Sequence, residues 1–201
     1  MRMLSYLSFA MVAAVMLVLP LAGCGDDRGT GQQAPGTSTI NPQTEQDIRM
    51  YEDALSKDPN NLSILIQLGN KYYDLGVEEI RQKGDAAEPV AKWEKAIGYY
   101  KRALAIEPGN ADVRTDMANL IQWLGRVDEA MVEYRMAKQS NPNHPQSRIN
   151  ILTLLAEAKQ DYKGAVKEYD DMVKAMPGQG TNFELAQQVE KYRQLAKEQS
   201  K

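Results

Sequence analysis

The chain has 201 residues, a mass of 22.5 kDa and a formal net charge of −3, with one histidine and one cysteine. This length suits one moderate domain with a normal core, and the lack of a basic excess argues against binding to nucleic acid or anionic lipid. One histidine and one cysteine make a metal centre or a disulfide framework improbable, so we expect no metal and no cofactor.

The N-terminus carries a long apolar run. Residues 3–25 follow Arg2, and the run ends in small residues just before Cys24. About 20 apolar residues suffice to cross a bilayer, so an uncleaved transmembrane anchor is one interpretation. A basic start, an apolar stretch and small residues at a cleavage position are typical of a processed secretory signal, which is the interpretation we favour.

The segment Leu21-Ala22-Gly23-Cys24 resembles a bacterial lipobox. The resemblance implies that residues 1–23 are removed as a signal peptide and that Cys24 receives a diacylglyceryl group and an acylated amino terminus. Several acyl chains would hold the domain durably, whereas one chain binds membranes only marginally. We therefore expect a bacterial membrane-anchored lipoprotein that faces the periplasm or the cell surface. Gly25, where retained inner-membrane lipoproteins commonly have aspartate, favours the outer membrane.

Residues 24–44 are predicted to be the lipidated cysteine and a flexible tether. They are mostly glycine, aspartate, threonine, glutamine, serine, proline and asparagine, and Ile40 is their one large aliphatic residue. Such a composition cannot offset the entropy of ordering. About 20 flexible residues reach roughly 25 Å, which would hold a domain off the lipid surface.

From residue 45 onward, apolar residues recur at helical spacings of three and four. Four tyrosines are each followed by a small or apolar residue at the third position and by proline at the eighth. These prolines, separated by 49, 34 and 35 residues, are Pro59, Pro108, Pro142 and Pro177. A period of 34 with one insertion predicts a helical solenoid, whose helices bury a core only by stacking on their neighbours.

The spaced residues resemble the tetratricopeptide repeat (TPR) family. The matching positions are Leu68-Gly69, Tyr72, Ala96, Tyr100, Ala103 and Pro108, and then Met117-Ala118, Ile121, Leu124-Gly125, Ala130, Tyr134, Ala137 and Pro142. The resemblance implies an all-α solenoid of antiparallel helix pairs over residues 45–201. It consists of a half-repeat at 45–61, repeats at 62–110, 111–144 and 145–178, and a C-terminal capping helix at 181–197.

Two of these repeats depart from the pattern. The third repeat has Leu152-Thr153 and Ala156 where leucine-glycine and an aromatic residue are usual. The first contains an insertion at 77–91, which we expect to lengthen both of its helices and to form either a decoration or a contact surface. Trp93 is expected to pack in the core beside this insertion.

In the tetratricopeptide family, the inner helix of each repeat presents side chains to a concave groove. Carried over to this sequence, the resemblance implies a partner-binding set of Ile66, Asn70, Tyr73, Asp74, Asp112, Thr115, Asp116, Asn119, Asn150, Leu154 and Glu157. Trp123 maps beside these residues, either as an anchor for a partner or with its ring folded onto the neighbouring repeat. The set lacks the lysines and arginines of members that clamp a terminal carboxylate. An extended or helical segment of basic or neutral character therefore suits it better.

No phosphate loop, nucleophile elbow or acid–base constellation is present, so we do not expect an enzyme. His144 lies in Pro142-Asn-His-Pro145 and is predicted to be an ordinary exposed turn residue. The sequence as a whole predicts an adaptor or assembly factor of the bacterial envelope that binds a peptide or helix in its groove. The alternative is a self-assembling scaffold, a homo-oligomer formed by end-to-end stacking of repeats.

Overall fold

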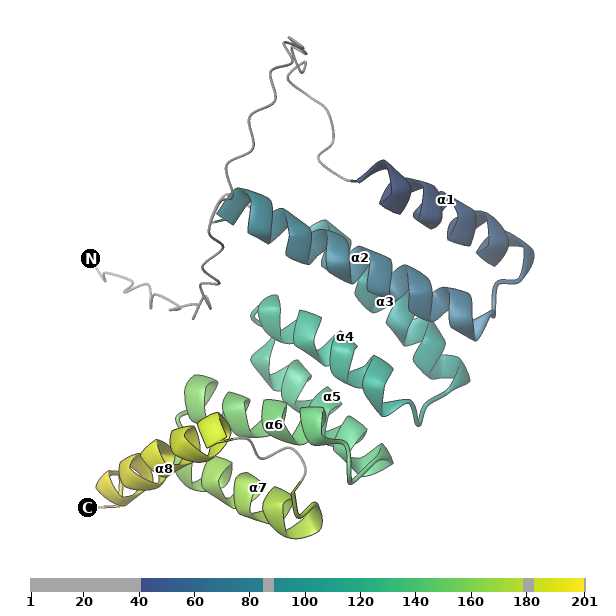
Figure 1. Ribbon diagram of the computed structural model, residues 1–201. Coiled ribbons are helices and arrows are strands. Elements are labelled where there is room, and N and C mark those ends of the chain that lie inside the picture. Colours follow the sequence, from purple (N-terminus) through teal and green to yellow (C-terminus); the bar gives the residue numbers. More distant parts are fainter. Residues whose placement is uncertain (1–40, 85–88, 179–182, 201) are drawn as a thin grey trace, which may run out of the picture. The chain divides into compact units, whose positions relative to one another are not determined.

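The computed structural model describes residues 41–84, 89–178 and 183–200, and the regular elements in this part of the chain are all helices (Figure 1). Its elements are α1 (Pro42–Lys57), α2 (Leu62–Lys83), α3 (Val90–Ile106), α4 (Ala111–Trp123), α5 (Val127–Ser140), α6 (Pro145–Thr153), the π-helical turn η2 (Leu154–Ala158), α7 (Tyr162–Ala175) and α8 (Phe183–Glu198). The all-α prediction is confirmed. The signal peptide, Cys24 and nearly all of the tether lie outside the described residues.

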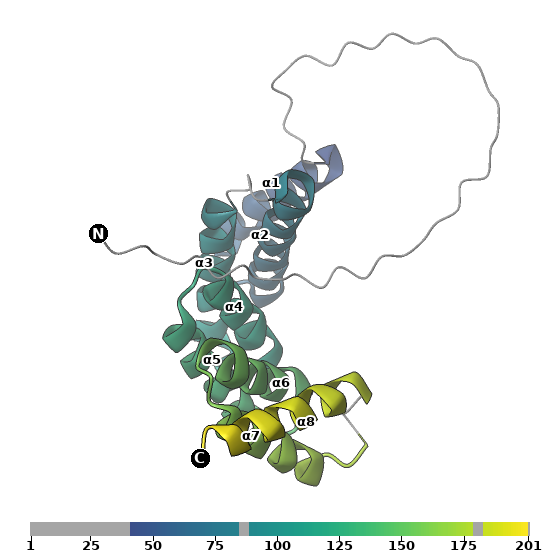
Figure 2. The same cartoon turned by 90° about the vertical axis from the view of Figure 1, so that its left-hand side faces the viewer.

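Consecutive helices pack side by side. Each helix from α2 to α7 contacts the one before it and the one after it, and α4 also touches α6 (Figures 1 and 2). Most connections are short turns, which force neighbouring helices to run antiparallel. The result is the stack of helix pairs that the 34-residue period predicts.

The start of α1 corrects one predicted boundary. The helix begins at Pro42, because Oδ1 of Asn41 accepts a hydrogen bond from the Gln43 amide at 2.9 Å and proline at the first position loses no helical hydrogen bond. Residues 42–44, which the sequence analysis assigned to the tether, are therefore helical. At the other end of the chain, the capping helix runs from Phe183 to Glu198.

Small residues let the helices approach closely, as the repeat pattern predicts. Gly69 lies against the ring of Tyr100, so a methyl group at this position would overlap the ring. Four alanines at helix contacts have no exposed surface, namely Ala96, Ala118, Ala130 and Ala165. The tyrosines and leucines fill the space beside them, and Tyr100, Tyr134, Leu65 and Leu68 are at most 1% exposed.

The insertion lengthens α2, as predicted. This helix has 22 residues and ends at Gly84, whose φ of 54° is unfavourable for a residue with a side chain. Buried Glu79 binds Lys83 at 2.7 Å and Lys92 of α3 at 2.5 Å, which ties the extended part of α2 to the next helix. Trp93 is 4% exposed, so its prediction as a core residue is confirmed.

Candidate functional site

Three turns between repeats share one capping device. Asn61, Asn110 and His144 are the N-caps of α2, α4 and α6, each two residues after a proline. The asparagine oxygens accept from backbone amides at 3.1 and 3.0 Å, and Nδ1 of His144 accepts from the Ser147 amide at 3.2 Å. His144 is only 9% exposed, so the prediction of an ordinary exposed turn residue is wrong. The imidazole nitrogen replaces the asparagine oxygen as the cap.

The capping role also fixes the tautomer of His144. Nδ1 is an acceptor, so the ring proton lies on Nε2, which donates to Oδ1 of Asp112 at 2.9 Å. The side chain of Asp112 is otherwise 87% exposed. The bond holds this carboxylate at the N-terminal end of α4, one turn before Asp116.

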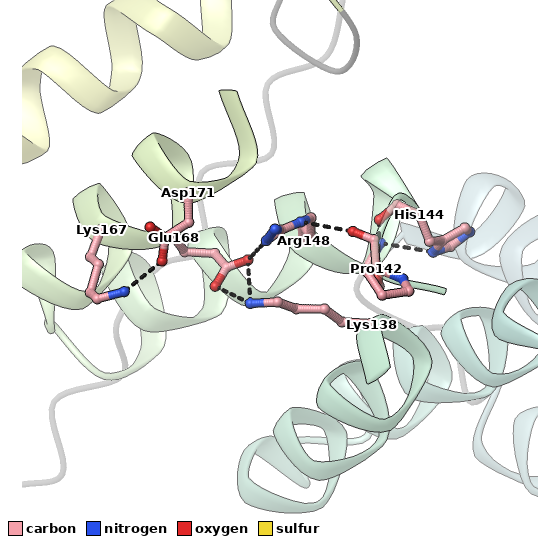
Figure 3. A network of polar contacts seen from close by, with 8 residues as sticks. Lys138, Pro142, His144, Arg148, Lys167, Glu168 and Asp171 are labelled. Atoms are coloured by element: carbon pink, nitrogen blue, oxygen red, sulfur yellow. Dashed lines mark hydrogen bonds and ion pairs between the residues drawn. The ribbon is translucent and has the colours of Figure 1, made fainter. Parts of the chain in front are cut away.

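A repeated ion pair fastens the inner and outer helices of two repeats. Arg114 of α4 binds Glu133 of α5 at 2.7 Å, and Arg148 of α6 binds Glu168 of α7 at 2.9 Å. Glu168 also accepts from Lys138 at 2.6 and 2.8 Å, as Figure 3 shows. These largely buried pairs tie α4 to α5, and α7 to α6 and α5.

The same two arginines also bind the preceding turns. Arg114 and Arg148 stand 34 residues apart and donate to the carbonyl oxygens of Pro108 and Pro142 at 2.9 and 3.2 Å. The two arginines hold the same position in consecutive repeats. This spacing was a sequence signal of a structural role that was not predicted.

Tyrosine hydroxyl groups donate hydrogen bonds to two of the asparagines that were predicted to bind a partner. Tyr100 donates to Oδ1 of Asn70 at 2.8 Å, and Tyr134 donates to Oδ1 of Asn119 at 2.7 Å. The side-chain amide of Asn150 also donates to Oδ1 of Asn119, at 2.7 Å. These predicted partner-binding asparagines therefore belong to an internal network that joins α2 to α3 and α4 to α5 and α6. They help to hold the inner helices of neighbouring repeats in place.

The ring of Trp123 packs on the neighbouring repeat, as one of the two alternatives predicted, and its role as an anchor for a partner stays a prediction. Its ring packs at a tilt against Tyr73 of α2 at a centroid distance of 5.5 Å and against Trp93 of α3 at 5.3 Å. It nevertheless remains 49% exposed at the end of α4. The ring is thus oriented by the neighbouring repeat while about half of its surface faces solvent.

Asp74 and Asp116 lie near Tyr73 of this cluster, and Asp112 lies one turn before Asp116 on α4. Burial, followed by the charges of Asp112 and Asp74, raises the pKa of Asp116 to about 6, while His144 acts in the opposite direction. Burial also raises the pKa of Asp74. The pKa of Tyr73 rises to about 12, chiefly through burial and then through the charge of Asp116. We call Tyr73, Asp74, Asp112, Asp116 and Trp123 the acidic aromatic face.

Three other predicted groove positions lie elsewhere. Glu157 accepts hydrogen bonds from Gln188 at 3.2 Å and Tyr192 at 3.3 Å, so it faces the capping helix α8. Leu154 lies in the π-helical turn and is 1% exposed. Its predicted groove position is wrong because the repeat alignment assumed an unbroken α-helix there. Thr115 is 2% exposed and donates to the Ala111 carbonyl at 2.7 Å.

The described residues contain neither a metal-binding cluster nor a membrane-spanning helix. Within residues 41–84, 89–178 and 183–200, no group of three or more histidine, cysteine, aspartate or glutamate side chains could hold a metal ion. None of the helices in those ranges has the length and apolar composition needed to cross a membrane.

Comparisons with known proteins agree with the helix pairing. Residues 91–157 match a tetratricopeptide repeat family model. A crystal structure of MamA superposes with a TM-score of 0.56 over 77% of this chain and 85% of that one, at 17% identity. The fold is that of a tetratricopeptide-repeat solenoid.

Two further solved structures share this TPR fold. A double mutant of MamA gives a TM-score of 0.55 at 11% identity and covers 70% of each chain. The first TPR domain of Spaghetti (RPAP3), bound to the HSP90 peptide SRMEEVD, gives 0.51 at 22% identity and covers 66% of this chain and 93% of that one. At identities this low, the structural likeness establishes the fold alone.

Proposed function

We propose that the protein is a membrane-anchored TPR lipoprotein of the bacterial cell envelope that acts as an adaptor or assembly factor. TPR proteins generally serve as adaptors without enzymatic activity, and the helix pairing here supports the same role. The partner is a peptide or helical segment of another protein. It binds on the acidic aromatic face, while Cys24 and its lipid hold the domain at the membrane.

The observation that carries the adaptor role is the state of Trp123. Hot spots of protein interfaces are enriched in tryptophan that enters a packed, desolvated environment on binding. The contacts with Tyr73 and Trp93 already orient the Trp123 ring, so little side-chain entropy remains to be lost. The exposed half of the ring supplies apolar area for the partner.

The charges on this face bear on the kind of segment that it can bind. The TPR domain of RPAP3 binds SRMEEVD, a peptide with three acidic side chains. The proposed face of this chain carries Asp74, Asp112 and Asp116. A partner segment with acidic character would be repelled, so the charges favour a basic or neutral one.

Photocrosslinking in cells tests the adaptor role. A benzophenone amino acid replaces Val77, which lies one helical turn beyond Tyr73 and is 38% exposed. We expect a discrete crosslinked protein that disappears when Trp123→Ala is added. The matched control carries the same probe at Phe183, which is 77% exposed on α8. The same crosslink from both positions, or one that Trp123→Ala leaves unchanged, would remove the proposed site.

Labelling with a fatty acid tests the anchor. Cys24→Ser should abolish incorporation of the label and release the protein from the membrane fraction. The helical content should stay unchanged, because the described core begins at Ile48. Label retained in the serine variant would contradict the proposed lipidation of Cys24.

Self-association is the second candidate function. In the described part of the chain no helix precedes α1 as its pair, and α1 exposes Met50 at 57%. End-to-end stacking would cover this helix. An ordered oligomer whose mass rises with concentration and which Met50→Asp disrupts would favour the scaffold, whereas a constant monomer mass favours the adaptor.

A further inference from the structure

The acidic aromatic face combines an oriented aromatic ring with a carboxylate that is partly withdrawn from water. Tyr73 links the two, because its ring contacts Trp123 and its hydroxyl lies within the field of Asp116. Asp116 and Trp123 are seven residues apart on α4, which places them on the same side of the helix about 10 Å apart. One short partner segment can therefore contact both.

The titratable groups that interact with Asp116 come from several elements. Asp74 of α2, Asp112 of α4 and His144 before α6 act on its pKa, and its own charge raises the pKa of Tyr73 of α2, Tyr100 of α3 and Tyr134 of α5. Two are carboxylates that disfavour a further negative charge. His144 favours that charge, and its ring already donates to Asp112. A cation from outside would offset the repulsion among the carboxylates.

Resting on the adaptor function above, we propose that the acidic aromatic face binds a cationic protein segment, whose lysine or arginine pairs with Asp116 while an apolar side chain of the segment covers Trp123. Binding is coupled to ionisation of Asp116. The carboxylic acid loses its proton to solvent, and the carboxylate that forms pairs with the incoming cation, so charge and protons balance.

The raised pKa of Asp116, about 6, sets the pH range of this coupling. At pH 7.5 the carboxylate is ready to pair, and little proton release is needed. At pH 5.0 most of it carries a proton that binding must remove. If the pairing lowers the pKa to about 4, the affinity at pH 5.0 should be about tenfold weaker than at pH 7.5.

The test uses the full-length protein in detergent and synthetic peptides of about twelve residues with blocked ends, long enough to lie across a helical face. In one peptide lysine alternates with alanine and leucine, and the matched peptides carry glutamine or glutamate instead of lysine. We expect the lysine peptide to bind at pH 7.5 at least tenfold more tightly than the glutamine peptide, and the glutamate peptide to bind least. Equal affinity of the lysine and glutamine peptides would overturn the proposal.

Substitutions of single carboxylates test whether Asp116 is the group that loses a proton on binding. Asp116→Asn should weaken binding of the lysine peptide at pH 7.5 and remove most of the difference between pH 7.5 and pH 5.0. Asp74→Asn should weaken binding but keep the pH dependence. Asp53→Asn, which removes a carboxylate from a surface pair on α1, should change neither. A pH dependence that survives in Asp116→Asn contradicts the coupling.

His144 needs its own control because its imidazole contacts Asp112 of the face. His144→Asn keeps a capping side chain and removes the imidazole, so we expect the pH dependence to persist in it. Loss of the pH dependence in this variant would assign the effect to the imidazole and overturn the role of Asp116. A face occupied by a second copy of the chain would instead show dimerisation that Trp123→Ala abolishes, which also overturns the proposal.

Failure of this inference is distinguishable from failure of the adaptor function. If the glutamine peptide binds as well as the lysine peptide and Trp123→Ala abolishes both, the face binds partners without selecting a cation. If the crosslink from position 77 is insensitive to Trp123→Ala, the adaptor site itself is wrong.

Discussion

The indole ring of Trp93 lies directly against the backbone of Gly76. A methyl group built on Gly76 would overlap the indole nitrogen, so α2 and α3 can approach this closely only because residue 76 has no side chain. Trp93 in turn packs against Trp123 at 5.3 Å. The position of the exposed ring thus depends on a glycine of α2 that lies just before the insertion.

Gly76→Ala should reveal this dependence. We expect the free energy of unfolding to fall by about 1–3 kcal/mol because the site is already full. Gly98 is the matched control, a helical glycine on α3 with no atom within 4 Å of its built Cβ. Gly98→Ala should stabilise the protein by about 0.5–1 kcal/mol. Urea unfolding of both variants measures this, and equal shifts would contradict the close contact.

The cap of α6 predicts different results for two substitutions of His144. Replacement by alanine removes the acceptor for the Ser147 amide and the bond to Asp112, and should cost about 1–2 kcal/mol. Asparagine caps the corresponding helices α2 and α4, so His144→Asn should cost clearly less. Denaturant melts decide between these results. An alanine variant as stable as the asparagine variant would show that the cap contributes little.

Breaking the buried ion pairs should be costly. Glu168 accepts from Arg148 and Lys138, and Glu168→Ala leaves the arginine buried with a carbonyl as its remaining partner in Figure 3. We expect a loss of about 3 kcal/mol, as for other buried pairs from which one partner is removed. Asp171→Ala breaks an exposed pair with Lys167 on the same helix and should stay within about 0.5 kcal/mol. A similar small effect for both would place Glu168 in solvent.

The raised pKa of Asp116 predicts that the free energy of unfolding depends on pH. Its folded pKa of about 6 lies above the ordinary value of 3.8, so the folded state binds the proton more tightly than the unfolded state does. The contribution of Asp116 to stability therefore rises as the pH falls through 6 toward 3.8. After allowance for partial exposure, wild type should gain about 1 kcal/mol relative to Asp116→Asn between pH 7.5 and pH 5.0. A constant difference between the two proteins would contradict the raised pKa.

Much of the fold was predictable because its signals recur. The tyrosine and proline spacing predicted the helix pairs, and the excess of 15 residues between Pro59 and Pro108 predicted the long α2. The cap at His144 was missed because histidine takes the place of asparagine, although Asn61 and Asn110 marked the position. One residue type changed while the hydrogen-bonding role stayed the same.

The candidate site was less predictable, because a repeat alignment gives positions without contacts. Leu154 matched the groove position of Asn70 and Asn119, yet the π-helical turn buries it. Glu157 matched another, yet it contacts α8, which lies outside the repeat pattern. The alignment also placed Asn70 and Asn119 on the groove face without revealing that tyrosine hydroxyl groups already bind them.

The most direct test of the account compares Trp123→Ala with Phe183→Ala, which removes a more exposed ring from α8. Binding of the lysine peptide to the full-length protein is measured together with urea unfolding of each variant. We predict that Trp123→Ala weakens binding by about 2 kcal/mol, as truncated aromatic anchors do, but lowers stability by less than the 3–5 kcal/mol typical of a buried tryptophan. Phe183→Ala should affect neither. A Trp123→Ala protein that binds normally but unfolds several kcal/mol more easily would assign the ring to the core and contradict the proposed site.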